Sequence, residues 1–394
     1  MKKDWEILDF EDCIEKVIYT KKVQRKDFLM NGEYPIISQE QDYINGYWDI
    51  ATDLFKVKKP VVIFGDHTQV LKYIDFDFIL GADGVKILEP KNIIESKYLY
   101  YYLQNINIGN LGYARHYRLL KEIKVCFPKS IPEQLQIVSI LDQAFAAIAK
   151  AKKNTEKNLQ NAKELFESYL KGVFENRHVG WEQKNLGEIT TKIGSGATPR
   201  GGNESYKQTG ISLVRSMNVH DLEFRDKNLA FIDDKQAKDL NNVTLHENDV
   251  LINITGASVA RCCMIPKDYL PARVNQHVSI IRTIKDIIDP LFLNLLLTSK
   301  YYKDQLLLTG EQGATRQAIT KVQLENFVIH YPNLKEQQAI VTKLDALSTE
   351  TKRLEAIYQQ KLLNLEELKK SVLQKAFSGQ LSESGFSGLN DKQD

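Results

Sequence analysis

A long segment of this sequence occurs twice, and the repeat constrains the fold more than any other feature. The segment from Glu133 to Phe174 aligns without a gap onto the segment from Glu336 to Phe377. Identical residues recur along the whole alignment, including Gln134/Gln337, Ile137/Ile340, Val138/Val341, Leu141/Leu344, Asp142/Asp345, Leu159/Leu362, Glu164/Glu367, Leu165/Leu368 and Leu170/Leu373. Such a repeat indicates that one structural unit is used twice in the chain.

Both copies of the repeat have the pattern of a long helix. Neither contains a proline, and the only glycine is Gly172, near the end of the first copy. Apolar residues recur with heptad spacing, so each helix has a stripe that it cannot bury alone, and we expect the two to pack as an antiparallel, coiled-coil-like pair. At ~1.5 Å per residue, ~44 residues of helix are about 66 Å long, which suits a spacer. The positions expected to pack in the pair are Leu141, Ile148, Leu165, Leu344, Leu347, Leu354, Leu365 and Leu368.

The repetition continues outside the two helices. A Trp-Glu pair opens each half, at Trp5-Glu6 and Trp181-Glu182. A Gly-x-x-Gly-x-x-Arg string precedes each helix, at Gly109 to Arg115 and at Gly310 to Arg316. An aromatic-Pro pair follows each string, at Phe127-Pro128 and Tyr331-Pro332. Between these shared ends the two halves diverge. There they contain short β-type runs such as Pro60–Phe64, Phe78–Leu80, Val250–Ile254 and His277–Arg282, and two helical patterns at Lys97–Gln104 and Pro290–Tyr302.

These patterns predict an α+β fold with an internal pseudo-twofold repeat. Two recognition-type domains of mixed α/β structure are expected to alternate with the two helices. The predicted boundaries are 1–130 for the first domain, 131–178 for the first helix, 179–333 for the second domain, 334–380 for the second helix and 381–394 for a disordered tail.

Composition narrows the class of protein. The formal net charge of the 394 residues is only +2, so a nucleic-acid surface has to be a local patch. The four cysteines form no CxxC pair and no cluster with histidine, so no metal site is expected. The start of the chain does not read as a signal peptide, and no run of about 18 apolar residues is present, so we expect a cytoplasmic protein.

The order of these features resembles the DNA-specificity subunits of type I restriction-modification systems. The resemblance rests on the Trp-Glu start, the glycine-arginine string and the Glu-Gln that follows a proline at each helix entry, and it covers essentially the whole chain. The strings Asn275-Gln276-His277-Val278 and Gly194-Ser195-Gly196-Ala197-Thr198-Pro199 also look like motifs of the target-recognition domains of that family.

The resemblance implies a non-catalytic targeting subunit. Each variable domain would read one half of a bipartite site in double-stranded DNA, and the helix pair would set the gap and dock two modification subunits. Those adenine-N6 methyltransferase subunits would carry S-adenosylmethionine, and restriction subunits would add translocation and cleavage with ATP and Mg. No cofactor is expected in this chain itself, and no membrane association. One chain with two different readers can recognise an asymmetric sequence, whereas a homodimer needs a palindrome.

Candidate DNA contacts in the first domain are polar residues of three loops. Basic side chains suit phosphates, and Gln or Arg can pair with base edges. A solvated charged surface is the alternative for the basic run, and an ion-paired structural role is the alternative for the duplicated arginine Arg115. The candidates are Lys22, Gln24, Arg25, Lys26, His67, Gln69, Arg115, His116 and Arg118.

Candidate contacts in the second domain lie in a glycine-rich loop, a second polar cluster, the Gln-His string and the segment that mirrors Arg115 and His116. The glycines let the backbone approach a phosphate closely, although no P-loop follows. A buried structural role at a strand start is an equal alternative for Gln276 and His277. The candidates are Ser195, Thr198, Arg200, Asn203, Arg215, Asn218, Gln276, His277, Arg316 and Gln317.

Catalytic motifs are missing from the sequence. The Asn/Asp-Pro-Pro-aromatic string of adenine methyltransferases would need a Pro-Pro pair, which the chain lacks, and no Walker A, His-Glu-x-x-His or Gly-x-Ser-x-Gly string occurs. Two alternatives stay open beside the targeting subunit. One is an enzyme with unrecognised nuclease or methyltransferase motifs, and the other is a coiled-coil scaffold that binds proteins rather than DNA.

Overall fold

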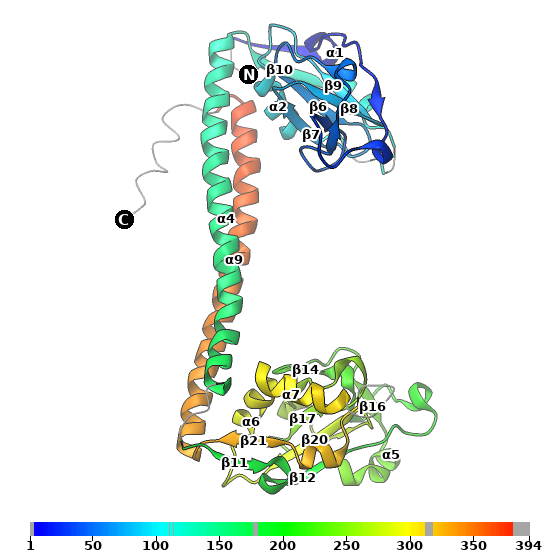
Figure 1. Ribbon diagram of the computed structural model, residues 1–394, viewed down its shortest axis with the longest axis vertical. Coiled ribbons are helices and arrows are strands. Elements are labelled where there is room, and N and C mark those ends of the chain that lie inside the picture. Colours follow the sequence, from blue (N-terminus) through cyan, green and yellow to red (C-terminus); the bar gives the residue numbers. More distant parts are fainter. Residues whose placement is uncertain (1–3, 110, 113, 176–179, 312–317, 381–394) are drawn as a thin grey trace. The chain divides into compact units, whose positions relative to one another are not determined.

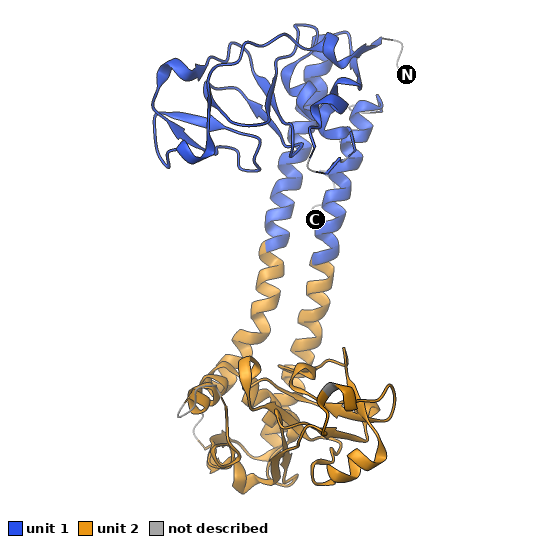
Figure 2. Ribbon diagram, turned by 90° about the vertical axis from the view of Figure 1, so that its right-hand side faces the viewer, with its two compact units in different colours: residues 1–156, 359–394 blue, residues 157–358 orange. Residues whose placement is uncertain are grey.

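The computed structural model describes residues 4–109, 111–112, 114–175, 180–311 and 318–380 (Figure 1). The predicted tail at 381–394 and the candidates Arg316 and Gln317 lie outside the described residues. The chain forms two compact units, residues 1–156 with 359–394 and residues 157–358 (Figure 2). Each unit therefore combines one globular domain with the first half of one long helix and the second half of the other.

The two long helices are α4 (Ile131–Glu175) and α9 (Leu334–Phe377), of 45 and 44 residues. Contacts within the units show that they pair antiparallel, because residues that advance along α4 meet residues that recede along α9. In unit 1 the contacts are Lys369 over the ring of Phe145 at 5.3 Å and Lys152 Nζ to Glu366 Oε1 at 2.7 Å; in unit 2 Lys343 lies over the ring of Tyr169 at 4.8 Å. None of the described helices is long and apolar enough to cross a membrane.

The packing seam differs from the expected heptad in the later part of each helix. Leu141 and Leu344 are fully buried, and Ile148, Leu347, Leu354 and Leu365 are half-buried, but Leu165 and Leu368 are 48% and 40% exposed. Their neighbours Phe166 and Lys369 are half-buried instead, Phe166 against the core of unit 2 and Lys369 over the ring of Phe145 of α4, which corrects the expectation for those two leucines. The cause is the 3.6-residue turn of a straight helix, which drifts by about 20° per heptad from a 3.5-residue repeat.

Domain 1, the part of unit 1 before α4, has two main sheets. One has the order β2-β8-β3-β4, with β5 also paired to β8, and the other has the order β7-β6-β9. Its strands are β1 (Trp5–Asp9), β2 (Lys22–Val23), β3 (Tyr34–Ile37), β4 (Gly46–Trp48), β5 (Leu54–Phe55), β6 (Val61–Gly65), β7 (Leu71–Ile74), β8 (Phe78–Gly81), β9 (Val85–Leu88) and β10 (Lys124–Pro128), and its helices are α1 (Phe10–Cys13), α2 (Ser96–Asn105) and α3 (Tyr117–Lys121).

Domain 2, the part of unit 2 between α4 and α9, has sheets of the order β12-β20-β17-β18 and β16-β13-β19. Its strands are β11 (Glu182–Asn185), β12 (Thr190–Ser195), β13 (Ile211–Val214), β14 (Val219–His220), β15 (Glu223–Phe224), β16 (Ala230–Ile232), β17 (Val250–Asn253), β18 (Cys262–Met264), β19 (Ala272–Val274), β20 (Val278–Thr283) and β21 (Val328–Tyr331). Its helices are α5 (Asp234–Asp239), α6 (Pro290–Thr298), α7 (Lys300–Glu311) and α8 (Lys321–Glu325).

The two domains share the pairing of their six central strands although their middle sequences diverge and their outer strands differ. In domain 1, β3 pairs parallel with β8 and antiparallel with β4, while β6 pairs antiparallel with β7 and β9. In domain 2, β13 pairs parallel with β19 and antiparallel with β16, while β17 pairs antiparallel with β18 and β20. The first and last strands of each domain also pair, β1 with β10 and β11 with β21. Equivalent loops can therefore be compared strand by strand.

The predicted short elements fall where buried apolar runs are longest. The run Val61 to Gly65 is buried at every residue and forms β6, as a continuous Val/Ile-rich run indicates. The predicted helix Pro290–Tyr302 is wrong in one respect, because Ser299 has extended backbone (φ −61°, ψ 146°) and divides it into α6 and α7.

Candidate nucleic-acid interface

The most informative part of both domains is the loop that joins the two equivalent hairpin strands. In domain 1 this hairpin loop spans residues 66–70, between β6 and β7, and in domain 2 it spans residues 254–261, between β17 and β18. Each loop is bonded to the segment directly before a short helix, α3 in domain 1 and α8 in domain 2: the His116 N–H donates to the Asp66 carbonyl at 2.7 Å, and the Ile319 N–H donates to the Ile254 carbonyl at 2.8 Å. In each domain several of the predicted contact residues that the structure describes lie on or beside these loops.

A basic cluster lies beside the hairpin loop of domain 1. Lys22 and Lys86 lie over the rings of Tyr19 and Tyr117, each at 5.1 Å from the ring centroid. Burial lowers the pKa of Lys22, and repulsion by the charges of Lys86 and Arg115 lowers it further. Lys86 is 3.7 Å from the buried carboxylate of Asp66, which offsets part of the charge. Cations held this close to one another favour an anionic partner such as a phosphate.

Hydrogen bonds to Gln39 hold the hairpin loop of domain 1 in place. The backbone N–H of His67 donates to Gln39 Oε1 at 3.1 Å, and the hydroxyl of Thr68 donates to the Gln39 carbonyl at 2.6 Å. The half-buried amide of Gln69 donates to the Gly109 carbonyl at 2.8 Å. Gly84 lies against the same glutamine, and a Cβ there would be 2.4 Å from Gln39 Oε1. The loop is thus a fixed surface rather than a free tip.

His116 does not lie on the surface, which corrects its prediction as a DNA contact. Its side chain is 1% exposed. Nε2 accepts a hydrogen bond from the Leu111 N–H at 3.1 Å, so Nδ1, which lies 3.0 Å from the Asp66 carbonyl, carries the proton and donates. His116 therefore joins the glycine-arginine string to the hairpin loop. Its neighbour Arg115 is exposed, as a phosphate contact requires.

The other basic candidates of domain 1 are exposed but lie at different places. Gln24, Arg25 and Lys26 are exposed at the short 3-10 turn Arg25–Asp27, and Arg25 pairs with Glu40 at 3.1 Å. Arg118 is exposed on α3. Sequence reasoning missed Lys86 because it reads as one polar residue inside a buried strand. Its only sequence signal is the alternation along β9.

In domain 2 a chain of hydrogen bonds brings three predicted segments together. The Thr198 hydroxyl donates to Gln276 Oε1, Gln276 Nε2 lies 3.2 Å from His277 Nε2, and His277 Nδ1 lies 2.6 Å from the hydroxyl of Thr255. The glycine-rich loop and the Asn-Gln-His string therefore meet at the hairpin loop. Gln276 is exposed and His277 half-buried, so the amide is the group of this chain that is most open to a base edge.

The hairpin loop of domain 2 also borders a cavity of about 460 Å³. Arg261 lies directly before strand β18 and His277 directly before strand β20, and both line the cavity. Met217, which is 43% exposed, forms part of its wall. In the described part of the chain, Arg261 forms no ion pair. Sequence reasoning missed Arg261 and Met217, because nothing in their neighbourhood in the sequence marks them; only the strand pairing places them beside His277. The cavity lining is Ser216, Met217, Thr255, Gly256, Ala257, Ser258, Arg261 and His277.

Asn218 is fully buried, which corrects its prediction as a contact. Its amide donates to the Arg225 carbonyl at 2.8 Å and its Oδ1 accepts from the Arg215 N–H at 3.1 Å. The guanidinium of Arg215 donates to the Asn228 carbonyl at 2.5 Å and lies 5.2 Å from the ring of Tyr206. Both residues therefore brace the turn at 216–218 that presents Met217.

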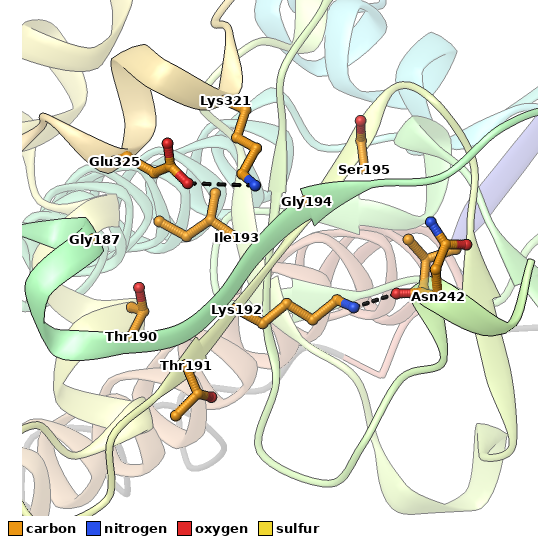
Figure 3. A pocket seen from close by; sticks show the side chains of 11 residues that line it. Gly187, Thr190, Thr191, Lys192, Ile193, Gly194, Ser195, Asn242, Lys321 and Glu325 are labelled. Atoms are coloured by element: carbon orange, nitrogen blue, oxygen red, sulfur yellow. Dashed lines mark hydrogen bonds and ion pairs between the residues drawn. The ribbon is translucent and has the colours of Figure 1, made fainter.

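A second cavity, of about 520 Å³, runs along strand β12 and includes the candidate Ser195 (Figure 3). Its two lysines are engaged, since Lys192 donates to the Asn242 carbonyl and Lys321 pairs with Glu325 at 3.4 Å. This cavity therefore offers less free positive charge than the hairpin loops. Arg200 is exposed in the glycine-rich loop, and the side chain of Asn203 lies outside what the structure describes. Among the described residues, no group of His, Cys, Asp and Glu side chains is placed to hold a metal ion.

Comparisons with known proteins bear on the whole chain. The family model described as "Type I restriction modification DNA specificity domain" matches residues 2–158 and 178–364. The chain is 25% identical over 351 residues to the type I restriction enzyme EcoR124I/EcoR124II specificity subunit of Escherichia coli, covering 84% of this chain and 83% of that protein. It is 24% identical over 412 residues to the MjaVIII specificity subunit of Methanocaldococcus jannaschii, covering 96% and 93%.

Solved structures have the same fold. A chain solved to explain complex assembly and conformational transition of the type I R-M system superposes with a TM-score of 0.70 at 17% identity, covering 96% of this chain and 99% of that one. The HsdS subunit from Thermoanaerobacter tengcongensis superposes with a TM-score of 0.63 at 17% identity, covering 97% and 98%. With the family model matched once in each half, this chain belongs to the type I restriction-modification DNA specificity family.

Proposed function

We propose that each domain binds one half of a bipartite target in double-stranded DNA, while the helix pair sets the gap between the half-sites and docks two modification subunits. The observation that carries this proposal is that the two domains have the same central strand pairing but present different residues on the equivalent loops. Domain 1 presents Lys22, Lys86 and Arg115 at its hairpin loop, whereas domain 2 presents Gln276, Met217 and Arg261 at the equivalent place. Two domains that share a strand arrangement but differ in their contact residues can read two different half-sites, as an asymmetric, two-part target requires.

The chain acts in this proposal as a targeting subunit without chemistry of its own. The modification subunits would bring S-adenosylmethionine and methylate adenine N6, and restriction subunits would bring ATP- and Mg-dependent translocation and cleavage. The family supports this assignment, and the uninterrupted helices α4 and α9 supply a stiff element of fixed length. The pseudo-twofold repeat supplies two similar surfaces for two copies of one partner.

The test is to express the chain with its modification subunits in a host that lacks adenine methylation and to map methylated adenines across the genome. The proposal expects two short defined half-sites separated by a constant number of unspecified bases. Methylation at unrelated sequences, or at a continuous site, would contradict it. Incubating the purified chain alone with S-adenosylmethionine or Mg²⁺ and DNA should give no turnover, and turnover without partners would favour an enzyme. Equal binding of the assembled complex to random duplexes would favour a protein-binding scaffold.

A further inference from the structure

We infer that Gln134 and Gln337 are positioning residues that fix the direction in which each long helix leaves its domain, and that they thereby make the complex strict about gap length. The inference rests on the proposed function, because it assumes that the helix pair sets the gap. It concerns two joints, one in each unit, that have the same construction.

The first joint is built around a fully buried glutamine at the start of α4. The Gln134 side-chain amide donates to the Pro128 carbonyl at 2.8 Å and to the Ile93 carbonyl at 2.9 Å, and its Oε1 accepts from the Glu95 N–H at 2.8 Å. One side chain thus connects the end of strand β10, the loop before α2 and the first turn of α4. Both donor hydrogens of the amide are used, so the side chain has little freedom to rotate.

The second joint repeats these bonds in domain 2. The Gln337 side-chain amide donates to the Pro332 carbonyl at 2.7 Å and to the Ile287 carbonyl at 3.1 Å, and its Oε1 accepts from the Asp289 N–H at 2.8 Å. Gln337 is also fully buried. Three equivalent partners in two domains whose middle sequences diverge indicate a requirement that both halves of the chain share.

An indole-carboxylate bond lies next to each glutamine. Trp5 Nε1 donates to Glu133 Oε1 at 3.2 Å, and Trp181 Nε1 donates to Glu336 Oε1 at 3.1 Å. Trp5 begins strand β1 and Trp181 directly precedes strand β11, while each glutamate lies in the first turn of the long helix. The start of the first strand, the end of the last strand and the loop before α2 or α6 are therefore all bonded to the helix start, in domain 2 through residues directly next to the strands.

The end of the other long helix packs on the same domain through aromatic contacts. The ring of Phe377 in α9 packs on the rings of Tyr98 and Tyr102 in α2, with ring centroids 5.3 and 5.2 Å apart. The ring of Phe174 in α4 packs on that of Phe292 in α6, with centroids 5.5 Å apart. Aromatic packing is strong but tolerates small rotations, whereas three hydrogen bonds to one buried amide define an orientation. The glutamine is therefore the element that sets the angle.

A small error in this angle matters because the hairpin loop lies to the side of the long helices: in domain 1, α2 lies between those helices and strands β6 and β7 (Figure 1). A turn of the domain about the joint therefore carries its hairpin loop along the direction of the helix axis, and a shift of roughly 3.4 Å is about the rise of one base pair. Loosening either joint should thus allow gaps that are one base pair longer or shorter. Side chains on the hairpin loops would be unaffected, so the half-site sequences should stay the same.

The experiment uses the full chain assembled with its modification subunits. The methylation map of the wild-type complex first gives the half-sites and the gap, and duplexes are then made with that gap and with one base pair more or fewer. For Gln134→Met and Gln337→Met we expect the ratio of methylation rates, native gap over altered gap, to fall by about tenfold, the order expected when buried groups lose one hydrogen-bonding partner. Exposed glutamines on the same helices give the controls, Gln143→Met and Gln338→Met, which should keep the wild-type ratio.

The rate ratio separates positioning from simple loss of stability. A variant that is merely less folded loses rate on all three duplexes together and keeps the ratio, and that outcome would overturn the inference. If Gln134→Met fails to assemble, Trp5→Phe tests the same joint, because it removes the indole N–H that bonds Glu133 and keeps an aromatic ring in the core; an unchanged ratio there overturns the inference. A wild-type complex that already accepts any gap would instead refute the proposed function.

Discussion

The ammonium group of Lys72 donates a hydrogen bond of 2.9 Å to Oδ1 of Asn45. Lys72 is only 3% exposed, and it also donates to the carbonyl of Asp42. Asn45 Oδ1 in turn accepts from the Ser38 N–H at 2.8 Å. This buried cation therefore fixes the loop at 38–45, which contains Gln39, the residue that holds the hairpin loop of domain 1.

The first prediction concerns the pH dependence of stability that Lys72 causes. Burial lowers the pKa of Lys72 from 10.5 to about 8, and the carboxylates of Glu40 and Asp42 offset part of that shift. Between these two values the unfolded chain binds more protons at this site than the folded chain, so the contribution of Lys72 to the unfolding free energy rises with pH. Urea denaturation of wild type and Lys72→Met from pH 8 to 10 should show their difference growing in favour of wild type. A difference that stays constant would contradict the shifted pKa.

The second prediction separates phosphate contacts from base contacts in domain 1. Arg115→Ala and Lys86→Ala should each weaken binding of the assembled complex to all duplexes alike. Each should also reduce the slope of log K against log salt by about 0.9, the value for one lost phosphate contact. Lys124→Ala is the control, because that lysine lies on β10, which pairs with β1 and not with the strands of the hairpin, and it is bonded to Asp9 at 2.7 Å. An unchanged slope for Arg115→Ala would remove it from the interface.

The third prediction concerns base recognition by domain 2. Gln276 is exposed, and its amide can pair with a base edge, so Gln276→Ala should relax the sequence preference at one position of one half-site, by about 1–3 kcal/mol. The half-site read by domain 1 should be unchanged. Methylation maps of wild type and variant give both results together. Relaxation in both half-sites, or in neither, would contradict the assignment of Gln276.

The sequence predicted the shared frame well and the individual contacts less well. Heptad spacing and the duplicated strings placed both long helices, because their cause is local and repeated. The seam at Leu165 and Leu368 was wrong because a heptad template ignores the drift of a straight helix. The prediction of His116 and Asn218 as contacts fails because polar residues in loops usually face solvent, whereas each of these satisfies buried backbone groups. Lys86 and Arg261 were missed because only strand pairing brings them to the hairpin loops.

The fourth prediction tests the corrected seam. Leu344 is fully buried against the core of domain 2, whereas Leu165 is 48% exposed on the partner helix. Leu344→Ala should therefore lower the unfolding free energy by about 2–5 kcal/mol, the usual range for a buried leucine. Leu165→Ala should change it by less than about 0.5 kcal/mol, as for an ordinary surface position. Urea denaturation measures both free energies. Equal losses would support the original heptad assignment, in which Leu165 packs in the helix pair.

The fifth prediction concerns helix length as the measure of the gap. Inserting four residues of good helix formers into α4 and four at the facing place in α9 adds slightly more than one turn to each, or about 6 Å at ~1.5 Å per residue. Since DNA rises by about 3.4 Å per base pair, the preferred gap should lengthen by about one or two base pairs, while both half-sites keep their sequences. Insertion into α4 alone is the matched control and should prevent assembly, because it shifts one seam against the other. A methylation map of the double insertion with the original gap would show that the helices do not set the spacing.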